Sequence, residues 1–128
     1  MPNYRRAWMS GGTYFFTVNL LQRQQSNLLV RHVDTLRAVV RDVRKRHPFI
    51  IHGWVVLPDH IHCIFSLPPE DSDFSLRWRL IKGDFSKMLP CSKLQSPSRQ
   101  KRGERGIWQR RYWEHLIRDE KDLNPDNL

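Results

Sequence analysis

The stretch FIIHGWVVLPDHIHCIFSL, residues 49–67, decides the fold of this chain. Its two halves, Phe49–Leu57 and His60–Leu67, consist largely of β-branched, aliphatic and aromatic residues, which favour strands with at least one buried face. Pro58 and Asp59 interrupt the run, because proline removes a backbone donor and aspartate favours turns. The stretch therefore predicts two consecutive strands.

A strand and a helix are expected before this stretch. Thr13–Leu20 (TYFFTVNL) follows the breaker Gly11-Gly12 and predicts the earlier strand. Apolar residues then recur at helical spacing, and Pro48 ends the predicted helix. The apolar residues of this first helix are Val33, Leu36, Val40 and Val43.

A second helix and a last strand are expected after it. Asp73 is the predicted N-cap of the helix, and Pro90 closes it. Ile107–Arg118 (IWQRRYWEHLIR) predicts the last strand. The apolar stripe of the helix consists of Phe74, Trp78, Ile81, Phe85 and Met88, and the basic residues expected on its outer face are Arg77, Arg79 and Lys82.

The element order is β-α-β-β-α-β, which predicts one α+β domain over residues 1–128. We expect a ferredoxin-like sandwich with an antiparallel sheet, both helices on one face, and the first and third strands central. The other face of the sheet would be open. Residues 91–106 are expected to form a basic mobile loop, and residues 119–128 an irregular tail, because neither segment has apolar periodicity.

The charge of the chain points to a polyanionic partner. Lys and Arg total 22 against 13 acidic residues, giving a formal charge of +9. Such an excess displaces condensed counterions from phosphates, although charge spread for solubility is the alternative. No apolar run approaches the ~20 residues that span a bilayer, so no membrane association is expected. Two cysteines without CxxC spacing and no apolar leader favour a cytoplasmic protein.

His60 and His62 are the candidate metal ligands. They lie two residues apart in a predicted strand, so both side chains leave the same face, while Ile61 and Cys63 point the other way. Two imidazoles can chelate a divalent cation and leave its other positions to a phosphate and a third ligand. The alternative is a surface pair that only stacks or hydrogen-bonds. His52 is expected to be structural.

Basic and aromatic residues alternate near both ends of the chain. Guanidinium groups on phosphates and aromatic rings on bases hold single strands without strict sequence readout, so we expect these residues to contact DNA. Ordinary solvated loop charge is the alternative. The predicted DNA contacts are Tyr4, Arg5, Arg6, Arg99, Lys101, Arg102, Arg105, Trp108, Arg110 and Arg111.

Four blocks of the chain resemble the REP-associated tyrosine transposases, relatives of the insertion-sequence-200-like single-tyrosine transposases. The most specific is WVVLPDHIHCIFSLP, and the blocks follow the family's order over nearly the whole chain. The others are YRRAWMSGGTYFFTVNL, FSLRWRLIKGDFS and WQRRYWEHLIRDEKD.

The resemblance implies an HUH endonuclease fold, with His60-Ile61-His62 as the HUH motif that holds Mg²⁺ or Mn²⁺. It also implies DNA strand cleavage and transposition through a 5′-phosphotyrosine in a bacterial, nucleoid-associated protein. The expected partner is single-stranded or hairpin DNA of palindromic repeats. An RRM-like RNA-binding module is a further alternative, although such a module would place aromatic residues where this chain has His60 and His62.

The chain departs from the family pattern after the WEH strand. The family's nucleophilic tyrosine would fall just beyond Leu128, so this copy is expected to bind DNA and metal but to cleave poorly or not at all. The alternative is an active endonuclease that uses Tyr112, the tyrosine nearest in sequence; Tyr14 is expected to pack. We also expect an exposed apolar patch involving Trp113 and Ile117, in a monomer or weak homo-oligomer.

Overall fold

The fold is described from a computed structural model, over residues 9–21, 27–89 and 106–117. Its elements are β1 (Thr13–Asn19), α1 (Leu28–Arg31), α2 (Val33–Arg46), β2 (Ile50–Val56), β3 (His60–Ser66), α3 (Phe74–Met88) and β4 (Trp113–Ile117). The predicted loop at 91–106, apart from its last residue, and the predicted tail at 119–128 lie outside the described residues.

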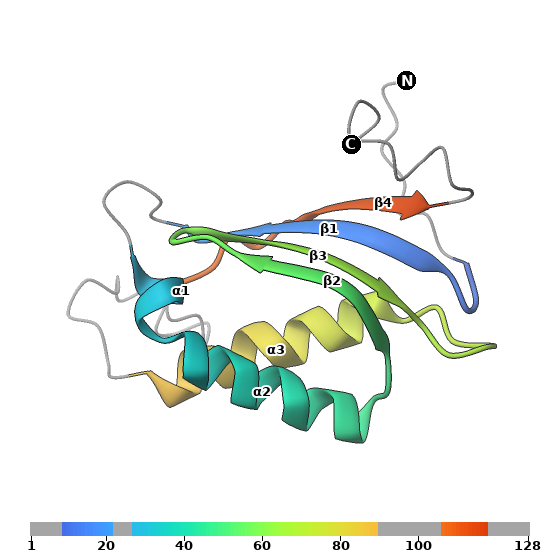
Figure 1. Cartoon of the computed structure of the whole chain (residues 1–128), viewed down its shortest axis with the longest axis horizontal. Helices are drawn as coiled ribbons and strands as arrows, with labels where there is room; N and C mark the ends of the chain where they lie inside the picture. Colours follow the sequence, from blue (N-terminus) through green and yellow to red (C-terminus); the bar gives the residue numbers. More distant parts are fainter. Residues whose placement is uncertain (1–8, 22–26, 90–105, 118–128) are drawn as a thin grey trace.

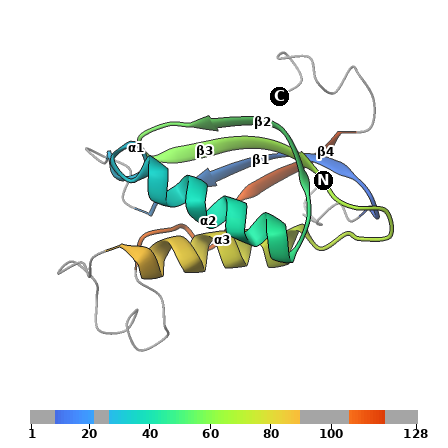
Figure 2. The same cartoon turned by 60° about the horizontal axis from the view of Figure 1, so that its bottom comes forward.

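The four strands form one antiparallel sheet in the order β2-β3-β1-β4. β1 and β3 are therefore central, as predicted, and β2 and β4 are the edges. Figures 1 and 2 show α2 and α3 side by side beneath one face of the sheet, while the other face has no described helix over it. This arrangement confirms the predicted ferredoxin-like α+β sandwich.

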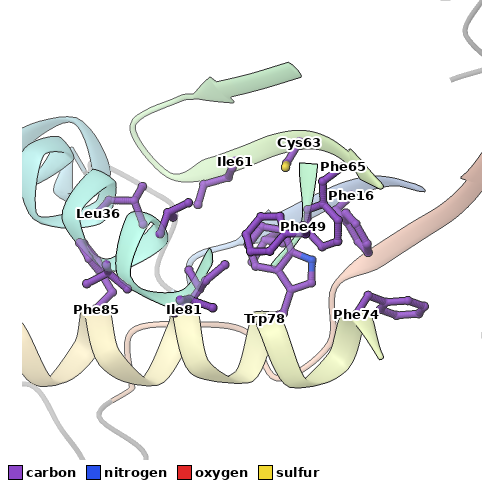
Figure 3. Close-up of a cluster of buried hydrophobic side chains, with 14 of the residues drawn as sticks. Phe16, Leu36, Phe49, Ile61, Cys63, Phe65, Phe74, Trp78, Ile81 and Phe85 are labelled. Carbon is purple, nitrogen blue, oxygen red and sulfur yellow. The ribbon is translucent and has the colours of Figure 1, made fainter. Parts of the chain in front are cut away.

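The core lies between the sheet and the two long helices. Along β1 and β3 every second residue is buried, the signature of strands with one face in a core. Phe16, Phe65 and Trp78 meet at the centre of this layer, with ring centroids 4.6–5.9 Å apart (Figure 3). Burial also raises the pKa of the Cys63 thiol, which keeps it protonated.

Helix α3 begins as predicted. The Asp73 side chain accepts a hydrogen bond from the Leu76 backbone N–H at 3.0 Å, which satisfies one of the free donors of the first turn. Arg79 is exposed, in agreement with the predicted outer face.

The prediction that Arg77 belongs to that outer face is wrong. Only 2% of this residue is exposed. Its guanidinium donates to the Asp71 carboxylate at 2.8 Å, to the Pro48 carbonyl at 2.8 Å and to the Asp73 carbonyl at 2.9 Å. Arg77 thus joins the turn before β2 to the turn before α3. Its burial is tolerated because an opposite charge and backbone oxygens replace water.

Two other expectations need correction. The short helix α1 precedes α2 and has no counterpart in the predicted pattern. The last strand covers Trp113–Ile117 rather than 107–118, and before it Trp108 makes only an isolated bridge to Leu20. The reason is packing: the Trp108 ring lies against Phe85, and its indole N–H donates to the Lys82 carbonyl at 3.1 Å.

Candidate functional site

The open face of the sheet brings the histidine pair beside residues from three other strands. Directly opposed residues of antiparallel strands share a face. One transverse row therefore runs from Val55 on β2 through His62 on β3 and Thr17 on β1 to Trp113 on β4. His60 comes two residues before His62 on β3, on the same face, and pairs with Asn19 of β1.

Each imidazole of the pair is held at its Nδ1 atom. His60 Nδ1 lies 2.7 Å from the Asp59 carboxylate, to which it donates. His62 Nδ1 lies 3.1 Å from the Thr17 hydroxyl. The two rings are edge to face with centroids 4.8 Å apart. When both Nδ1 atoms carry their hydrogens, both Nε2 lone pairs are left for a shared ligand, as oriented metal-binding histidines require.

The electrostatics favour neutral imidazole at His62. Burial lowers the pKa of His62, and the neighbouring His60 adds a smaller effect in the same direction. A neutral ring is the form that binds a metal ion, because protonation removes the lone pair.

Within the described part of the chain, no group of three or more His, Cys, Asp or Glu side chains is placed to hold a metal ion. The fit to a divalent cation therefore rests on two nitrogen donors, with their supporting partners Asp59 and Thr17, and on an open face that leaves room for phosphate oxygens.

The described tyrosines lie on the side opposite to the histidine pair. Tyr14 is fully buried, and its hydroxyl is hydrogen-bonded to the backbone of Met9. Tyr112 packs its ring against Trp78, and its hydroxyl donates to the Ser75 hydroxyl at 3.3 Å. The sheet therefore separates the Tyr112 phenol from His60, which argues against the alternative in which Tyr112 attacks a phosphate held at the pair.

The predicted DNA contacts that the structure describes differ in their exposure to solvent. Arg110 and Arg111 are exposed just before β4, whereas Trp108 is partly buried against α3. Arg110 also lines a groove of about 420 Å³ with Arg79 and Lys82 of α3, on the helix side. The predicted contacts outside the described residues are Tyr4, Arg5, Arg6, Arg99, Lys101, Arg102 and Arg105.

Sequence reasoning missed several neighbours of the pair. Thr17 and Asp59 hold its imidazoles, and Phe15 stacks on His62 with centroids 5.6 Å apart. The signal for Asp59 was available, because it directly precedes His60 in the chain. Nothing local identifies Thr17 or Phe15, since their role depends on strand register.

His52, which was predicted to be structural, is hydrogen-bonded through Nε2 to the Ser66 hydroxyl at 2.6 Å. Trp113 is 43% exposed, in agreement with the predicted apolar patch, whereas Ile117 is only partly exposed. Among the described helices, none has the length and apolar character needed to cross a membrane.

The family profile described as "Transposase IS200 like" matches residues 3–122, so the chain belongs to this family. It is 46% identical over 122 residues to the REP-associated tyrosine transposase of Escherichia coli (strain K12). It also matches the solved structure of a REP-associated tyrosine transposase bound to a REP hairpin, with a TM-score of 0.77, 45% identity and 96% of this chain covered. The family and fold implied by the sequence resemblance are thereby confirmed.

The match covers only part of the length of each relative. The aligned region covers 95% of this chain and 66% of the Escherichia coli protein, and likewise 66% of the chain in the hairpin complex. The chain thus spans less than two thirds of the length of these relatives.

Proposed function

We propose that this chain binds single-stranded DNA hairpins formed by palindromic repeats and presents a divalent cation to them at His60 and His62. The observation that carries the proposal is the pair itself: two neighbouring imidazoles on the open face, each hydrogen-bonded at Nδ1, so that Nε2 of each ring is the nitrogen left for a ligand. The kinship with a transposase seen bound to a REP hairpin supports DNA as the partner.

The chemistry of the donors suits this role. A bound Mg²⁺ or Mn²⁺ would polarise a phosphodiester and neutralise charge that develops on it. His60 and His62 hold the ion, Asp59 keeps the His60 ring oriented, and Thr17 does the same for His62. Because Mg²⁺ prefers oxygen ligands, two nitrogen donors favour Mn²⁺ of the two ions.

The DNA backbone is held by basic residues in this proposal. The +9 charge provides the long-range attraction, and Arg110 and Arg111 are exposed where the chain enters β4. The basic residues of the N-terminal segment and of residues 99–105 extend the contact, as the sequence predicts. A basic surface of this kind gives binding that weakens steeply with salt.

Strand cleavage by Tyr14 or Tyr112 is not part of the proposal. An attacking phenol must meet phosphorus in line with the leaving oxygen, and both phenols lie on the helix side of the sheet. We therefore propose that these 128 residues bind the hairpin and the metal without a covalent adduct through either tyrosine.

The direct test mixes the purified protein with a labelled single-stranded repeat hairpin and Mn²⁺ and compares native with denaturing gels. We expect a shifted band on the native gel and no covalent adduct on the denaturing gel. An adduct that disappears in Tyr112→Phe would overturn the proposal for Tyr112. The absence of any shift at low salt would overturn hairpin binding.

Metal binding is tested separately by titration calorimetry with Mn²⁺. The double variant His60→Ala/His62→Ala should lose Mn²⁺ binding. The control is His52→Ala, an exposed histidine on the same face that contacts Ser66 rather than the pair, and it should bind as the unmodified protein does. Equal Mn²⁺ affinity in all three proteins would refute the site.

An RNA-binding module is the second candidate, because aromatic rings also lie on the open face. Phe15 and Trp113 pack edge to face there, with centroids 5.7 Å apart. The same hairpin made as RNA distinguishes the two. The proposal expects tighter binding of the DNA form, and a preference for the RNA form would favour the alternative.

A further inference from the structure

The outer edge of the sheet at β2 lies beside an arginine-rich face of α2. β2 is the end strand in the order β2-β3-β1-β4, so among the described strands it pairs with β3 alone (Figure 1). Edge strands of natural proteins often carry charged residues or proline, which discourage pairing with a further strand. The sequence of β2, IIHGWVV, has neither, although its register shifts between Ile51 and Gly53. The outer edge of β2 is therefore suited to accept another extended chain.

A hollow of about 230 Å³ lies between this strand and α2. Its apolar lining consists of Val40 from α2 and of Ile51 and Trp54 from β2. The Trp54 ring is held in place, because it stacks on the buried Trp78 with centroids 6.1 Å apart and planes 11° apart. The hollow thus offers a firm apolar surface for a side chain, directly beside the edge strand.

Three arginines of α2 complete the lining of the hollow and form an arginine row: Arg37, Arg41 and Arg44. They lie at positions i, i+4 and i+7 on one face of the helix, and all three are exposed. Among the described residues, Arg41 and Arg44 belong to no ion pair. Arg37 approaches Asp34 only at 4.0 Å. Arg44 is oriented, because its Nε donates to the Phe49 carbonyl at 3.1 Å. The row therefore presents positive charge that the described fold does not neutralise.

The edge strand, the hollow and the arginine row suit one kind of ligand. A peptide that adds to the edge of a sheet gains main-chain hydrogen bonds, while its alternate side chains enter pockets. Arg37 and Arg44 are separated by about 10 Å along the helix axis, at roughly 1.5 Å per residue. Two acidic side chains that flank an apolar one on the same face of an extended chain span about 13 Å. The flexible Arg and Glu side chains can bridge this small difference.

Two other occupants use fewer of these features. A nucleic-acid backbone matches the charge of the arginine row but uses neither the edge of β2 nor the apolar lining. A second copy that paired antiparallel through β2 would have its helix layer on the same side of the joined sheet, so two arginine rows would face each other. Like charges placed against each other oppose association. An acidic extended peptide uses the edge, the hollow and the row together.

We propose that the outer edge of β2 binds an extended acidic peptide of a partner protein as an additional strand. An apolar side chain of the peptide occupies the hollow, and its flanking carboxylates meet the arginine row. This inference goes beyond the proposed function and does not depend on it, because it involves neither DNA nor the histidine pair.

The probe is a fluorescein-labelled peptide, Thr-Glu-Thr-Leu-Thr-Glu-Thr, which has its glutamates and its leucine on one face when extended. Fluorescence anisotropy should show saturable binding with a Kd below about 1 mM, and the peptide with Lys in place of Glu should not bind. Arg41→Glu should weaken binding at least about 10-fold, because it replaces attraction by repulsion. The matched control is Lys45→Glu, which makes the same charge change on the same helix outside the hollow and should lose far less affinity.

Backbone methylation of the peptide separates strand addition from simple charge attraction. In an extended chain, the N–H groups of alternate residues point to the same edge. A peptide methylated at its Thr amides and one methylated at its Glu and Leu amides should therefore differ, and only one of them should still bind. Hydrogen exchange followed by NMR should also show new protection at alternate amides of β2 when the unmethylated peptide is added. Equal binding of both methylated peptides without new protection would overturn strand addition.

The remaining outcomes also decide the proposal. No peptide binding up to about 1 mM by a protein that circular dichroism shows to be folded overturns it. It is also overturned if Arg41→Glu leaves peptide binding unchanged and weakens hairpin binding more than Lys45→Glu does, since the row then belongs to a DNA surface. Protection of the β2 amides by self-association, without peptide, would assign the edge to a second copy. Where Arg41→Glu is misfolded, Arg37→Glu takes its place.

The failure of this inference and the failure of the proposed function are distinguishable. The peptide assay contains no DNA, so the absence of hairpin binding leaves its result unaffected. A protein that binds the hairpin but not the peptide overturns the peptide site alone.

Discussion

The two faces of the sheet use the same strands for different purposes. On β1, the ring of Phe16 faces the helices and is fully buried, whereas Phe15, its neighbour in the chain, faces the open side and is only partly buried. On β3, Ile61 likewise faces the helices and His62 faces the open side. The buried face supplies stability, and the open face holds the residues that can meet a ligand. The two faces are not independent. Packing of the buried face sets the strand register, and the register decides which side chains are neighbours on the open face.

Replacement of two neighbouring phenylalanines tests the difference between the two faces most directly. Phe16→Ala should destabilise the protein by about 3–5 kcal/mol, because it removes a fully buried ring that packs against Phe65, Phe74 and Trp78. Phe15→Ala should cost about 1 kcal/mol, because its ring is partly hydrated in the folded state. Urea denaturation measures both values. Equal losses would show that the open face is also a packed interface.

The buried arginine should give the next largest effect. Arg77→Met removes the charge that pairs with Asp71 and leaves two backbone carbonyls without their donor, so a loss of about 3 kcal/mol is expected. Arg79→Met, two residues along the same helix but exposed, should change stability by less than about 0.5 kcal/mol. A similar result for both variants in urea denaturation would contradict the bridging role of Arg77.

The same ion pair predicts a dependence on pH. The hydrogen bond from Arg77 holds the pKa of Asp71 below its ordinary value of 3.8. A carboxyl with a depressed folded-state pKa stabilises the protein fully above its unfolded pKa, and this contribution is lost as the pH falls through the folded pKa. Stability should therefore fall below about pH 4, and Asp71→Asn should show a smaller decrease over that range. Denaturant midpoints measured from pH 6 to pH 2 test this, and parallel curves for the two proteins would refute it.

The smallest effect on stability is expected on the open face, beside the histidines. Asp59→Ala removes the acceptor that orients His60, so Mn²⁺ affinity should fall about 10- to 100-fold. Unfolding free energy should change by less than about 0.5–1 kcal/mol, because the carboxylate contributes little to the core. Calorimetric titration and urea denaturation of the same sample give the two numbers. A large loss of stability with unchanged Mn²⁺ affinity would assign Asp59 to the fold rather than to the site.

Prediction from the sequence succeeded where the signal is local. Alternation along His60–Ser66 identified which residues face the core, and the spacing from Phe74 to Met88 identified a helix with its cap at Asp73. It failed at Arg77, because its helical position looked like an outer one and its partners Pro48 and Asp71 come from two separate turns. The sequence also predicted too long a last strand. Aromatic residues such as Trp108 and Tyr112 give the same sequence pattern whether they lie in a strand or pack against the core beneath the sheet.

The sequence by itself determined that His60 and His62 share one face of a strand, since side chains alternate with a period of two wherever the chain is extended. It also determined the excess positive charge. Only the tertiary structure decided that Thr17 holds His62, although 45 residues separate them, and that Trp113 meets Phe15 on the open face while Tyr112 points to the other side. The physical reason is that strand register is set by the packing of the whole core, and residues remote in the chain carry no local mark of the neighbours that this packing assigns to them.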